Sequence, residues 1–281
     1  MTYKSILVHV DRSRHAPTRI RWAAQLARAH GACLVGAAMT GIPRTVFPHG
    51  YDSPAGSLSA SCFDPLVENA RRALDEFAAI AREAGADHDT RLVCDVADDG
   101  LALLARFADL VVTTRDDPDE ATTDGAIRVP ESVILQCARP VIALPLVPVQ
   151  PLLPAAIRKV VLAWDGSKES STAIHAALPM LQADVQVLVA SVDTPLDRHG
   201  DVVAEHAELL ACLARYGIHA AATVRPPAAS PGAALLAVAA EFGADLLAMG
   251  CYGHTKWREL CLGGASRTVL ADAGLPVLFA H

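Results

Sequence analysis

A glycine-rich segment of the sequence has a spacing that suits an anion. Gly250 and Gly253 are separated by two residues, nine more residues lead to Gly263, and Gly264 and Ser266 follow. Glycine lets backbone N–H groups approach a ligand without interference from a Cβ atom, and a helix that begins there adds unpaired N–H groups. The segment is neither a Walker A sequence nor a G-x-G-x-x-G sequence. Its expected chemistry is phosphate binding through backbone groups.

This segment follows one of ten short apolar runs that alternate with Ala-rich amphipathic segments. Short, continuous runs of Val, Ile and Leu are typical of strands buried on both faces, as in parallel sheets. Such strands are predicted at 6–10, 33–39, 91–94, 109–113, 140–144, 159–164, 185–192, 220–224, 245–249 and 276–280. Helices are predicted at 14–30, 64–84, 98–107, 130–138, 167–181, 201–216, 231–242 and 265–273. The alternation predicts doubly wound parallel sheets, whose ligands bind beyond the carboxyl ends of the strands.

The chain also repeats itself. The sequence SILVHVDRS matches KVVLAWDGS, which places Asp11 on Asp165 at an offset of 165 − 11 = 154. The sequence ADLVV matches ADLLA, which places Asp109 on Asp245 at an offset of 245 − 109 = 136. The difference of 154 − 136 = 18 predicts about that many extra residues in the first copy. We place them in a loop near 42–65, which is rich in Gly, Pro and Ser.

Between the copies, the sequence PVQPLLPAA carries three prolines and suits an extended connector. We therefore expect two domains, 1–148 and 157–281, each an α/β unit with an open, twisted, five-stranded parallel sheet and helices on both faces. The runs 141–144 and 277–280 would be apolar sheet edges, and pairing them would hide unpaired backbone groups. This predicts that the domains pack as a pseudo-dimer, and the same edges could support a homodimer of full chains.

The second copy resembles the universal stress protein family. The resemblance rests on the strand ADLLAMG, the glycine spacing that follows it, the terminal strand PVLFA, and Asp165, Gly166 and Ser167 after the first strand. The whole chain is similar to a tandem, two-domain, UspA-like member, with a Rossmann-like fold related to that of the adenine nucleotide α-hydrolases. The resemblance implies that the second domain binds ATP or another adenine nucleotide, with Mg²⁺ as an accompanying ion.

The same resemblance implies which residues contact the nucleotide. Asp165 would lie against adenine and ribose, Val192 would contact adenine through its backbone, and the later glycines would surround the phosphates. Gly264 stands where the family prefers Ser or Thr, so one hydroxyl donor is missing, at a cost of about 1 kcal/mol. The implied binding residues are Ala163, Trp164, Asp165, Val192, Met249, Gly250, Gly253, Gly263, Gly264, Ala265 and Ser266.

The first copy lacks this glycine set. The equivalent positions at an offset of 136 are Thr114, Asp117, Ile127 and Arg128, and none is glycine. The loop 115–125 carries five carboxylates against one arginine, which would repel a triphosphate. We therefore expect a degenerate site with a structural or partner-binding role in the first copy, and one nucleotide per chain.

Other polar residues have simpler interpretations. The acidic run could bind Mg²⁺ or Ca²⁺, but it lacks the spacing of a calcium loop and suits a solvated surface. One Cys-x-x-His pair without a second pair does not predict zinc, so no metal site is expected. Basic residues that could reach phosphate oxygens, but that on a surface loop are usually solvated, are His254, Lys256, Arg258 and Arg267. Histidines expected to be structural are His9, His175, His206 and His219.

Composition narrows the cellular context. The chain of 281 residues has 24 basic and 31 acidic side chains, a formal charge of −7, which does not predict binding to nucleic acid. No apolar run approaches the ~20 residues that cross a bilayer, and the N-terminal segment lacks the pattern of a signal peptide. Seven cysteines without a Cys-x-x-Cys pair suit reduced thiols. We expect a cytoplasmic protein that does not contact membranes.

The sequence gives little support for catalysis. It contains no G-x-S-x-G or H-E-x-x-H sequence and no recognisable general base for phosphate hydrolysis. The resemblance therefore implies a nucleotide-dependent stress-response module with at most weak ATPase activity. Two alternatives stay open: a nucleotide-free scaffold for protein interactions, and a slow metal-dependent ATPase.

Overall fold

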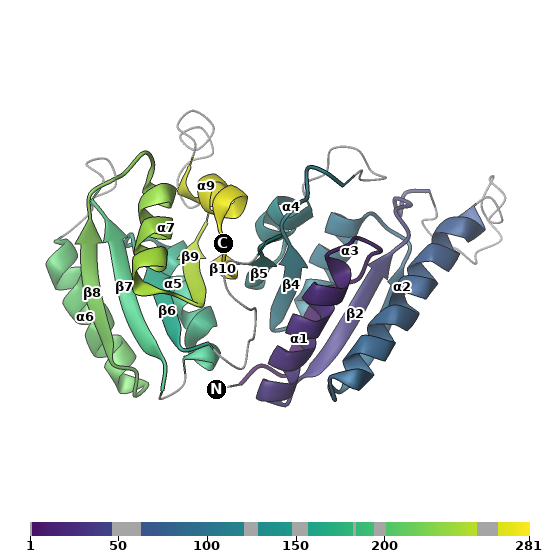
Figure 1. The fold of residues 1–281 in the computed structure, drawn as a ribbon, viewed down its shortest axis with the longest axis horizontal. Coiled ribbons are helices and arrows are strands. Elements are labelled where there is room, and N and C mark those ends of the chain that lie inside the picture. The colour runs from purple at the N-terminus through teal and green to yellow at the C-terminus, as the bar shows by residue number, and fades with distance from the viewer. Residues whose placement is uncertain are drawn as a thin grey trace. The chain divides into compact units, whose positions relative to one another are not determined.

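The computed structural model describes residues 2–46, 63–120, 129–147, 157–181, 184–193, 201–251 and 264–281. The chain divides into two compact units, Thr2–Val141 and Ile142–His281 (Figure 1). In each half, strands and helices alternate along the chain, and helices lie on both faces of the strands. The α/β class with parallel strands is therefore confirmed, whereas the division into two five-stranded sheets, the domain limits and the pseudo-dimer stay predictions.

The first half of the chain supplies five strands and four α-helices among its described residues. They are β1 (Ser5–His9), α1 (Ala16–His30), β2 (Cys33–Met39), α2 (Asp64–Glu83), β3 (His88–Val93), α3 (Ala97–Leu104), β4 (Leu110–Thr114), α4 (Val129–Gln136) and β5 (Val141–Leu144). A short 3-10 helix, Ala105–Phe107, extends α3.

The second half repeats this order within its described residues. Its elements are β6 (Lys159–Ala163), α5 (Lys168–Ala177), β7 (Gln186–Val192), α6 (Val202–Arg215), β8 (Ala220–Arg225), α7 (Pro231–Phe242), β9 (Leu246–Gly250), α9 (Ala265–Asp272) and β10 (Val277–Ala280). A 3-10 helix, Leu178–Met180, extends α5. The helices and strands thus lie where the hydrophobic pattern predicts them, to within a few residues.

Strand register confirms the repeat. Ile6 of β1 pairs with Leu110 of β4, and Val160 of β6 pairs with Leu246 of β9, so the offsets are 160 − 6 = 154 and 246 − 110 = 136. On its other side β1 pairs with β2, which pairs with β3; β6 likewise pairs with β7, which pairs with β8, and β9 pairs with β10. Every one of these pairs is parallel, so the carboxyl ends of neighbouring strands share one edge of the sheet.

The expectation that all strands are buried on both faces is wrong for β3 and β8. In each of these strands four of the six residues are exposed and the other two are half-buried, from His88 to Val93 and from Ala220 to Arg225. Each of these strands has one neighbour in the described strand pairing: β3 pairs with β2, and β8 pairs with β7. The central strands β1, β4, β6 and β9 are buried almost throughout.

Two equivalent aspartates hold the opposite, amino-terminal edge of the central strands. Asp109 Oδ2 accepts hydrogen bonds from the N–H groups of Lys4 and Ser5 over 2.7 and 3.0 Å. Asp245 Oδ2 accepts them from Arg158 and Lys159 over 2.8 and 2.9 Å. The repeated Ala-Asp-Leu sequence therefore has a structural role at each strand start.

Replacing either aspartate with alanine should destabilise the protein by about 1–2 kcal/mol, because two backbone N–H groups lose a charged acceptor. Urea unfolding of the Asp109→Ala and Asp245→Ala variants measures this loss. The Asp→Asn variants serve as matched controls, since an amide oxygen still accepts. Alanine variants that unfold at the wild-type urea concentration would contradict this role.

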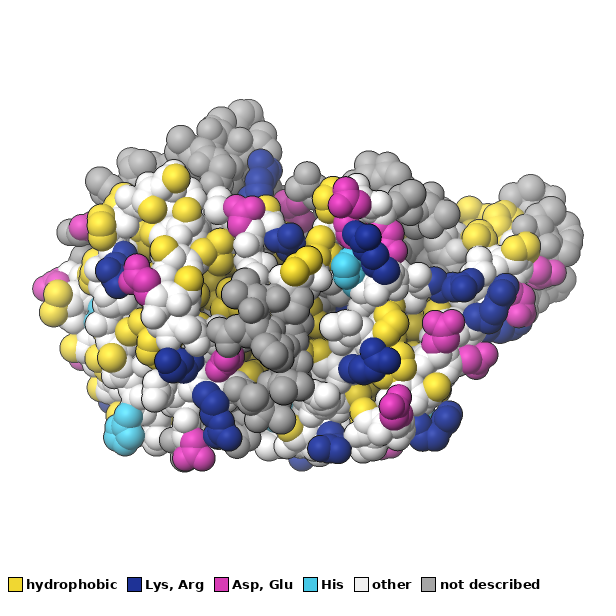
Figure 2. Space-filling view, in the orientation of Figure 1, with side chains coloured by type: hydrophobic (Ala, Val, Ile, Leu, Met, Phe, Trp, Pro, Cys, Tyr) yellow, Lys and Arg dark blue, Asp and Glu magenta, His cyan; other side chains and the backbone are white. Residues whose placement is uncertain are grey.

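The surface carries charges of both signs, as the composition leads one to expect. Lys and Arg side chains are interspersed with Asp and Glu side chains on the face shown in Figure 2. Within the described residues, no helix combines the length and the apolar character needed to cross a bilayer.

Candidate functional site

The carboxyl ends of the strands in the second half bring together those predicted binding residues that the structure describes. Strand β6 lies between β7 and β9. The next strand in the chain, β7, is on one side of β6, and the later strand β9 is on the other, so the strand order reverses at β6. Such a reversal of strand order is where open α/β sheets bind ligands. The described residues at this edge are Trp164 and Asp165 after β6, Val192 at the end of β7, and Met249 and Gly250 at the end of β9.

The turn after β6 is closed by Asp165. Its Oδ1 accepts hydrogen bonds from the N–H and hydroxyl groups of Ser167 over 3.0 and 2.6 Å. Ser167 is also the N-cap of α5, where its Oγ accepts the N–H of Ser170 over 3.1 Å. Gly166 between them has φ +79°, a left-handed conformation that disfavours side chains with a Cβ atom. The Asp-Gly-Ser sequence thus sets the direction in which α5 begins.

Gly250 allows α5 to approach the end of β9. A Cβ atom at this position would lie 2.4 Å from the backbone nitrogen of Ser170 and 2.5 Å from the carbonyl carbon of Glu169. Only glycine fits against the first turn of the helix at this distance. This contact places the N-terminus of α5 directly at the carboxyl edge of β9.

The start of α9 offers donors at the same edge. Its N-cap is Gly264, which has no side chain to cap the helix. Ser266 in the first turn is buried, with 4% of its surface exposed. Among the residues that the structure describes, the N–H groups of Ala265 and Ser266 have no acceptor. Free N–H groups at a helix N-terminus, together with the helix dipole, favour a negatively charged ligand.

In the first half, buried side chains fill the equivalent positions. Arg19 is 2% exposed and donates to the carbonyl of His9, to Oγ1 of Thr114 and to Oδ1 of Asp11, over 2.8 to 2.9 Å. By the two offsets, its equivalent in the second half is Ala173, and the equivalent of Thr114 is Gly250. A guanidinium group therefore lies between α1 and β4, where α5 packs directly against β9.

This cluster shifts the titration of its members. Burial lowers the pKa of His9 to about 4, an effect that Arg19 adds to and Asp11 opposes. Burial acts to raise the pKa of Asp11, but the charges of Arg19 and His9 and hydrogen bonds from Ser13 and Arg19 outweigh it, so this pKa lies well below its ordinary value. His9 is thus neutral and Asp11 ionised at neutral pH.

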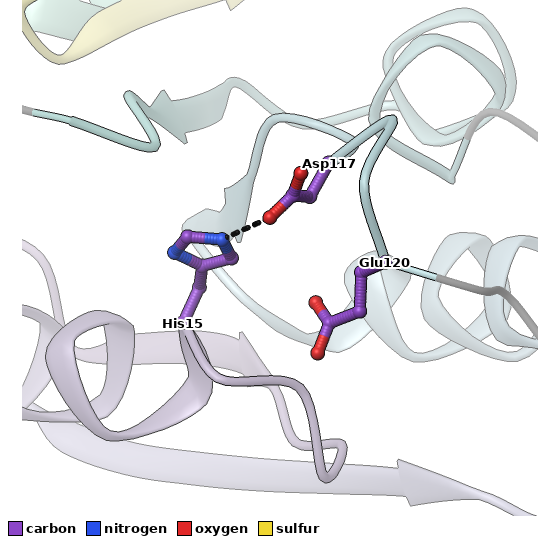
Figure 3. Close-up of side chains that lie close together, drawn as sticks. All are labelled: His15, Asp117 and Glu120. Atoms are coloured by element: carbon purple, nitrogen blue, oxygen red, sulfur yellow. Dashed lines mark hydrogen bonds and ion pairs between the residues drawn. The ribbon is translucent and has the colours of Figure 1, made fainter.

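A second network closes the loops after β1 and β4 in the first half (Figure 3). His15 Nε2 lies 2.7 Å from Asp117 Oδ2, and Arg14 Nε donates to the same oxygen over 2.8 Å. The N–H of Arg14 donates to Glu120 Oε1 over 2.9 Å. The hydrogen bond from His15 lowers the pKa of Asp117 to about 2 against the effect of burial, helped by the N–H of Asp119 and by Arg14.

Ligand atoms of His15, Asp117 and Glu120 lie within 4.8 Å of one another, a spacing that a divalent cation could bridge. Arg14 already forms an ion pair with Asp117 at this point, so a cation would have to displace the guanidinium group. By the offset of 136, Asp117 stands where the second half has Gly253. The first half therefore presents a paired carboxylate where the second has a glycine.

The helix start also differs between the halves. At an offset of 136, Pro130 near the beginning of α4 is equivalent to Ser266 near the beginning of α9. Proline has no N–H group, so α4 lacks a donor that α9 retains. Among the described residues, the start of α4 thus has one backbone donor fewer than the start of α9, and charged side chains bind one another at the same edge.

Comparison with known proteins agrees with this geometry. Residues 156–281 match the model of the Universal stress protein family. The second half of the chain is a universal stress protein domain. No curated protein matches the sequence.

Solved structures extend the similarity of the fold to the whole chain. A universal stress protein from Archaeoglobus fulgidus DSM 4304 is 15% identical, with a TM-score of 0.73 over 98% of this chain and 95% of its own. A protein of unknown function from Pseudomonas aeruginosa PAO1 is 14% identical, with a TM-score of 0.62 over 99% of this chain and 92% of its own. A universal stress protein from Archaeoglobus fulgidus in complex with dAMP is 22% identical, with a TM-score of 0.36 over 51% of this chain and 98% of its own.

The structure describes nine of the eleven binding residues that the family resemblance implies. Gly253 and Gly263 lie outside the described residues, as do His254, Lys256 and Arg258. Sequence reasoning missed the side chains that surround Trp164 in the universal stress protein domain, apart from its expectation that His206 is structural. These are Ser191, Glu205 and His206, whose polar types at buried or half-buried positions were the available signal.

The low pKa of the buried His9 predicts that the stability of the folded state depends on pH. The unfolded chain takes up a proton at this residue below pH 6.5, but the folded protein does so only near pH 4. The folded state should therefore lose about 3 kcal/mol from this residue as the pH falls from 6.5 to 4. Urea unfolding of wild type and His9→Gln across this range tests it. The variant should lose less stability than wild type, and identical losses would contradict the assignment.

Proposed function

We propose that the universal stress protein domain binds ATP or another adenine nucleotide at the carboxyl edge of β6 and β9. The base and ribose lie near Trp164, Asp165, Val192 and Met249, and the phosphates near the start of α9. In this proposal Gly253 and Gly263 complete the phosphate site, as the family resemblance implies. Mg²⁺ accompanies the phosphates as a further ligand.

One observation carries the proposal: the two halves differ at the same edge. The second half keeps the N–H groups of Ala265 and Ser266 at a helix start without an acceptor among the described residues. The first half has Pro130 at that point and joins Arg14 to Asp117 nearby. A fold used twice has therefore retained anion-binding groups in one copy. We infer one nucleotide per chain, bound by the second half.

The proposed cellular role rests on the family resemblance and on the sequence, which contains no recognisable motif for phosphate hydrolysis. We propose a cytoplasmic stress-response module in which nucleotide binding, with little or no hydrolysis, changes the interactions of the protein. The first half supports the fold or a partner, the two halves pair with each other, and full chains could form a homodimer. Neither nucleic acid nor a membrane is a partner in this proposal.

Calorimetric titration of ATP tests the binding site with a matched pair of variants. Ser167→Ala removes the N-cap of α5 and the hydroxyl bond to Asp165, and it should weaken ATP binding about 3–10-fold. Ser13→Ala removes the equivalent hydroxyl bond to Asp11 and should leave ATP binding unchanged. A Gly253→Val, Gly263→Val variant should give no heat.

The outcomes separate the alternatives. No heat with the wild-type protein would refute nucleotide binding and favour the scaffold hypothesis. Equal losses in the Ser13→Ala and Ser167→Ala variants would contradict the location in the second half. Circular dichroism of each variant controls for unfolding.

Hydrolysis has a separate test. The sequence contains no recognisable motif for a general base in phosphate hydrolysis, so phosphate release with Mg²⁺ should be far slower than the roughly 1–100 s⁻¹ of kinases. A sensitive phosphate assay with and without Mg²⁺ measures it. Turnover at about 1 s⁻¹ or faster would contradict a binding module and favour a metal-dependent ATPase.

A further inference from the structure

A polar network joins the first turns of α6 to the end of β6 in the universal stress protein domain. The hydroxyl of Ser191 donates to the carbonyl of Trp164 over 2.7 Å and lies 2.8 Å from His206 Nε2. Because this hydroxyl has only one proton, His206 must donate its Nε2 proton to the Ser191 oxygen. Burial lowers the pKa of His206, an effect that Glu205 opposes, so the ring is neutral at neutral pH. The carbonyl of Trp164 is thereby fixed through two buried side chains.

Glu205 binds the side chain of Trp164, whose backbone carbonyl is bound by Ser191. The indole N–H of Trp164 donates to Glu205 Oε2 over 3.1 Å. The same carboxylate oxygen would lie 3.1 Å from a Cβ atom at Gly166, so it also lies against the turn that leads to Ser167. Trp164 directly follows β6 and is only half-buried, so the residue lies at the carboxyl edge of the sheet without being enclosed there.

The first half shows that the fold does not need this network. After α2, the N–H of Ala86 donates to the carbonyl of Ala81, and after α6 the N–H of Ile218 donates to the carbonyl of Leu213. These two bonds are equivalent, so they align α2 with α6 at an offset of 218 − 86 = 132. Strand pairing of Ser5 with Cys33 and of Lys159 with Gln186 relates β2 to β7 by 186 − 33 = 153. The equivalents of Trp164, Ser191, Glu205 and His206 are therefore Val10, Ala38, Ala73 and Leu74, and all four are buried apolar residues.

This difference indicates a role other than stability. A well-packed apolar cluster is generally as stabilising as a buried polar network, or more so, since burying polar groups costs desolvation. The polar version occurs in the half that retains the anion-binding helix start, next to the residues expected to meet the base. Its effect is to fix one aromatic ring and one turn at that edge.

We propose that Ser191, Glu205 and His206 are positioning residues that hold Trp164 as a side wall for a flat purine base. The proposal rests on the nucleotide site proposed above and assigns the selection of the base to residues of β7 and α6. The indole N–H is already bound by Glu205, so the ring offers its apolar surface for contact with the base. The phosphate groups are bound elsewhere, at the start of α9, and are independent of the network.

The first half supplies the residues for the test. A Ser191→Ala, His206→Leu variant introduces the pair that the fold already accommodates as Ala38 and Leu74. Calorimetry compares ATP, which has a base, with inorganic tripolyphosphate, which has none. We expect the affinity for ATP to fall about tenfold, because a base loses a fixed aromatic contact, and the affinity for tripolyphosphate to stay unchanged.

Glu205 gives a second, independent pair of variants. Glu205→Gln keeps an oxygen that can accept the indole N–H and should bind ATP nearly as well as wild type, whereas Glu205→Ala should weaken ATP about tenfold. Glu208→Ala, on the exposed side of the same helix, should have no effect.

Each result decides between the proposals. Wild-type affinity for ATP in both the Ser191→Ala, His206→Leu and Glu205→Ala variants would overturn the positioning role while leaving the nucleotide site intact. Equal losses for ATP and tripolyphosphate would also overturn it, because the network would then support the whole site and not the base. Absence of binding of both compounds by the wild-type protein would refute the nucleotide site itself, and the positioning role with it.

Discussion

The first strand of each half, β1 or β6, is hydrogen-bonded on both sides, and this pairing determines where a ligand can bind. In the second half, β6 pairs with β7 and with β9, and both pairs are parallel. The carboxyl ends of these strands must then share an edge, while the helices that follow them leave toward different faces. The Asp165 turn, the start of α5 against Gly250 and the start of α9 therefore meet at one place.

The same constraint has two chemical outcomes in this chain. In the first half the shared edge is held by its own charges: Arg19 is buried beside Asp11, and Asp117 is bound by Arg14 and His15. In the universal stress protein domain the equivalents of Arg19 and Asp117 are Ala173 and Gly253, whereas Asp11 is matched by Asp165. A different polar network, of Ser191, Glu205 and His206, surrounds Trp164 on the β7 side of β6. In the first half the charged groups bind one another, whereas in the described part of the second half the N–H groups of Ala265 and Ser266 at the start of α9 have no acceptor.

Sequence patterns predicted the elements well because the central strands are continuously apolar and the helices are amphipathic. The prediction failed at β3, which begins at His88 and not at residue 91, because an exposed edge strand carries polar residues that hide its period. The turn at Asp165, Gly166 and Ser167 could be recognised from the sequence because its residues are adjacent, and its role as a nucleotide contact stays a prediction. The contacts of Arg14 with Asp117 and of Ser191 with His206 join distant segments, and only the packed structure brings them together.

The central claim is that two copies of one fold carry one nucleotide site. The most direct test is a crystal structure of the protein grown with a non-hydrolysable ATP analogue. The account predicts one analogue per chain, with its base beside Trp164 and its phosphates at the N-terminus of α9. An analogue bound at the equivalent edge of the first half, or in both halves, would contradict it.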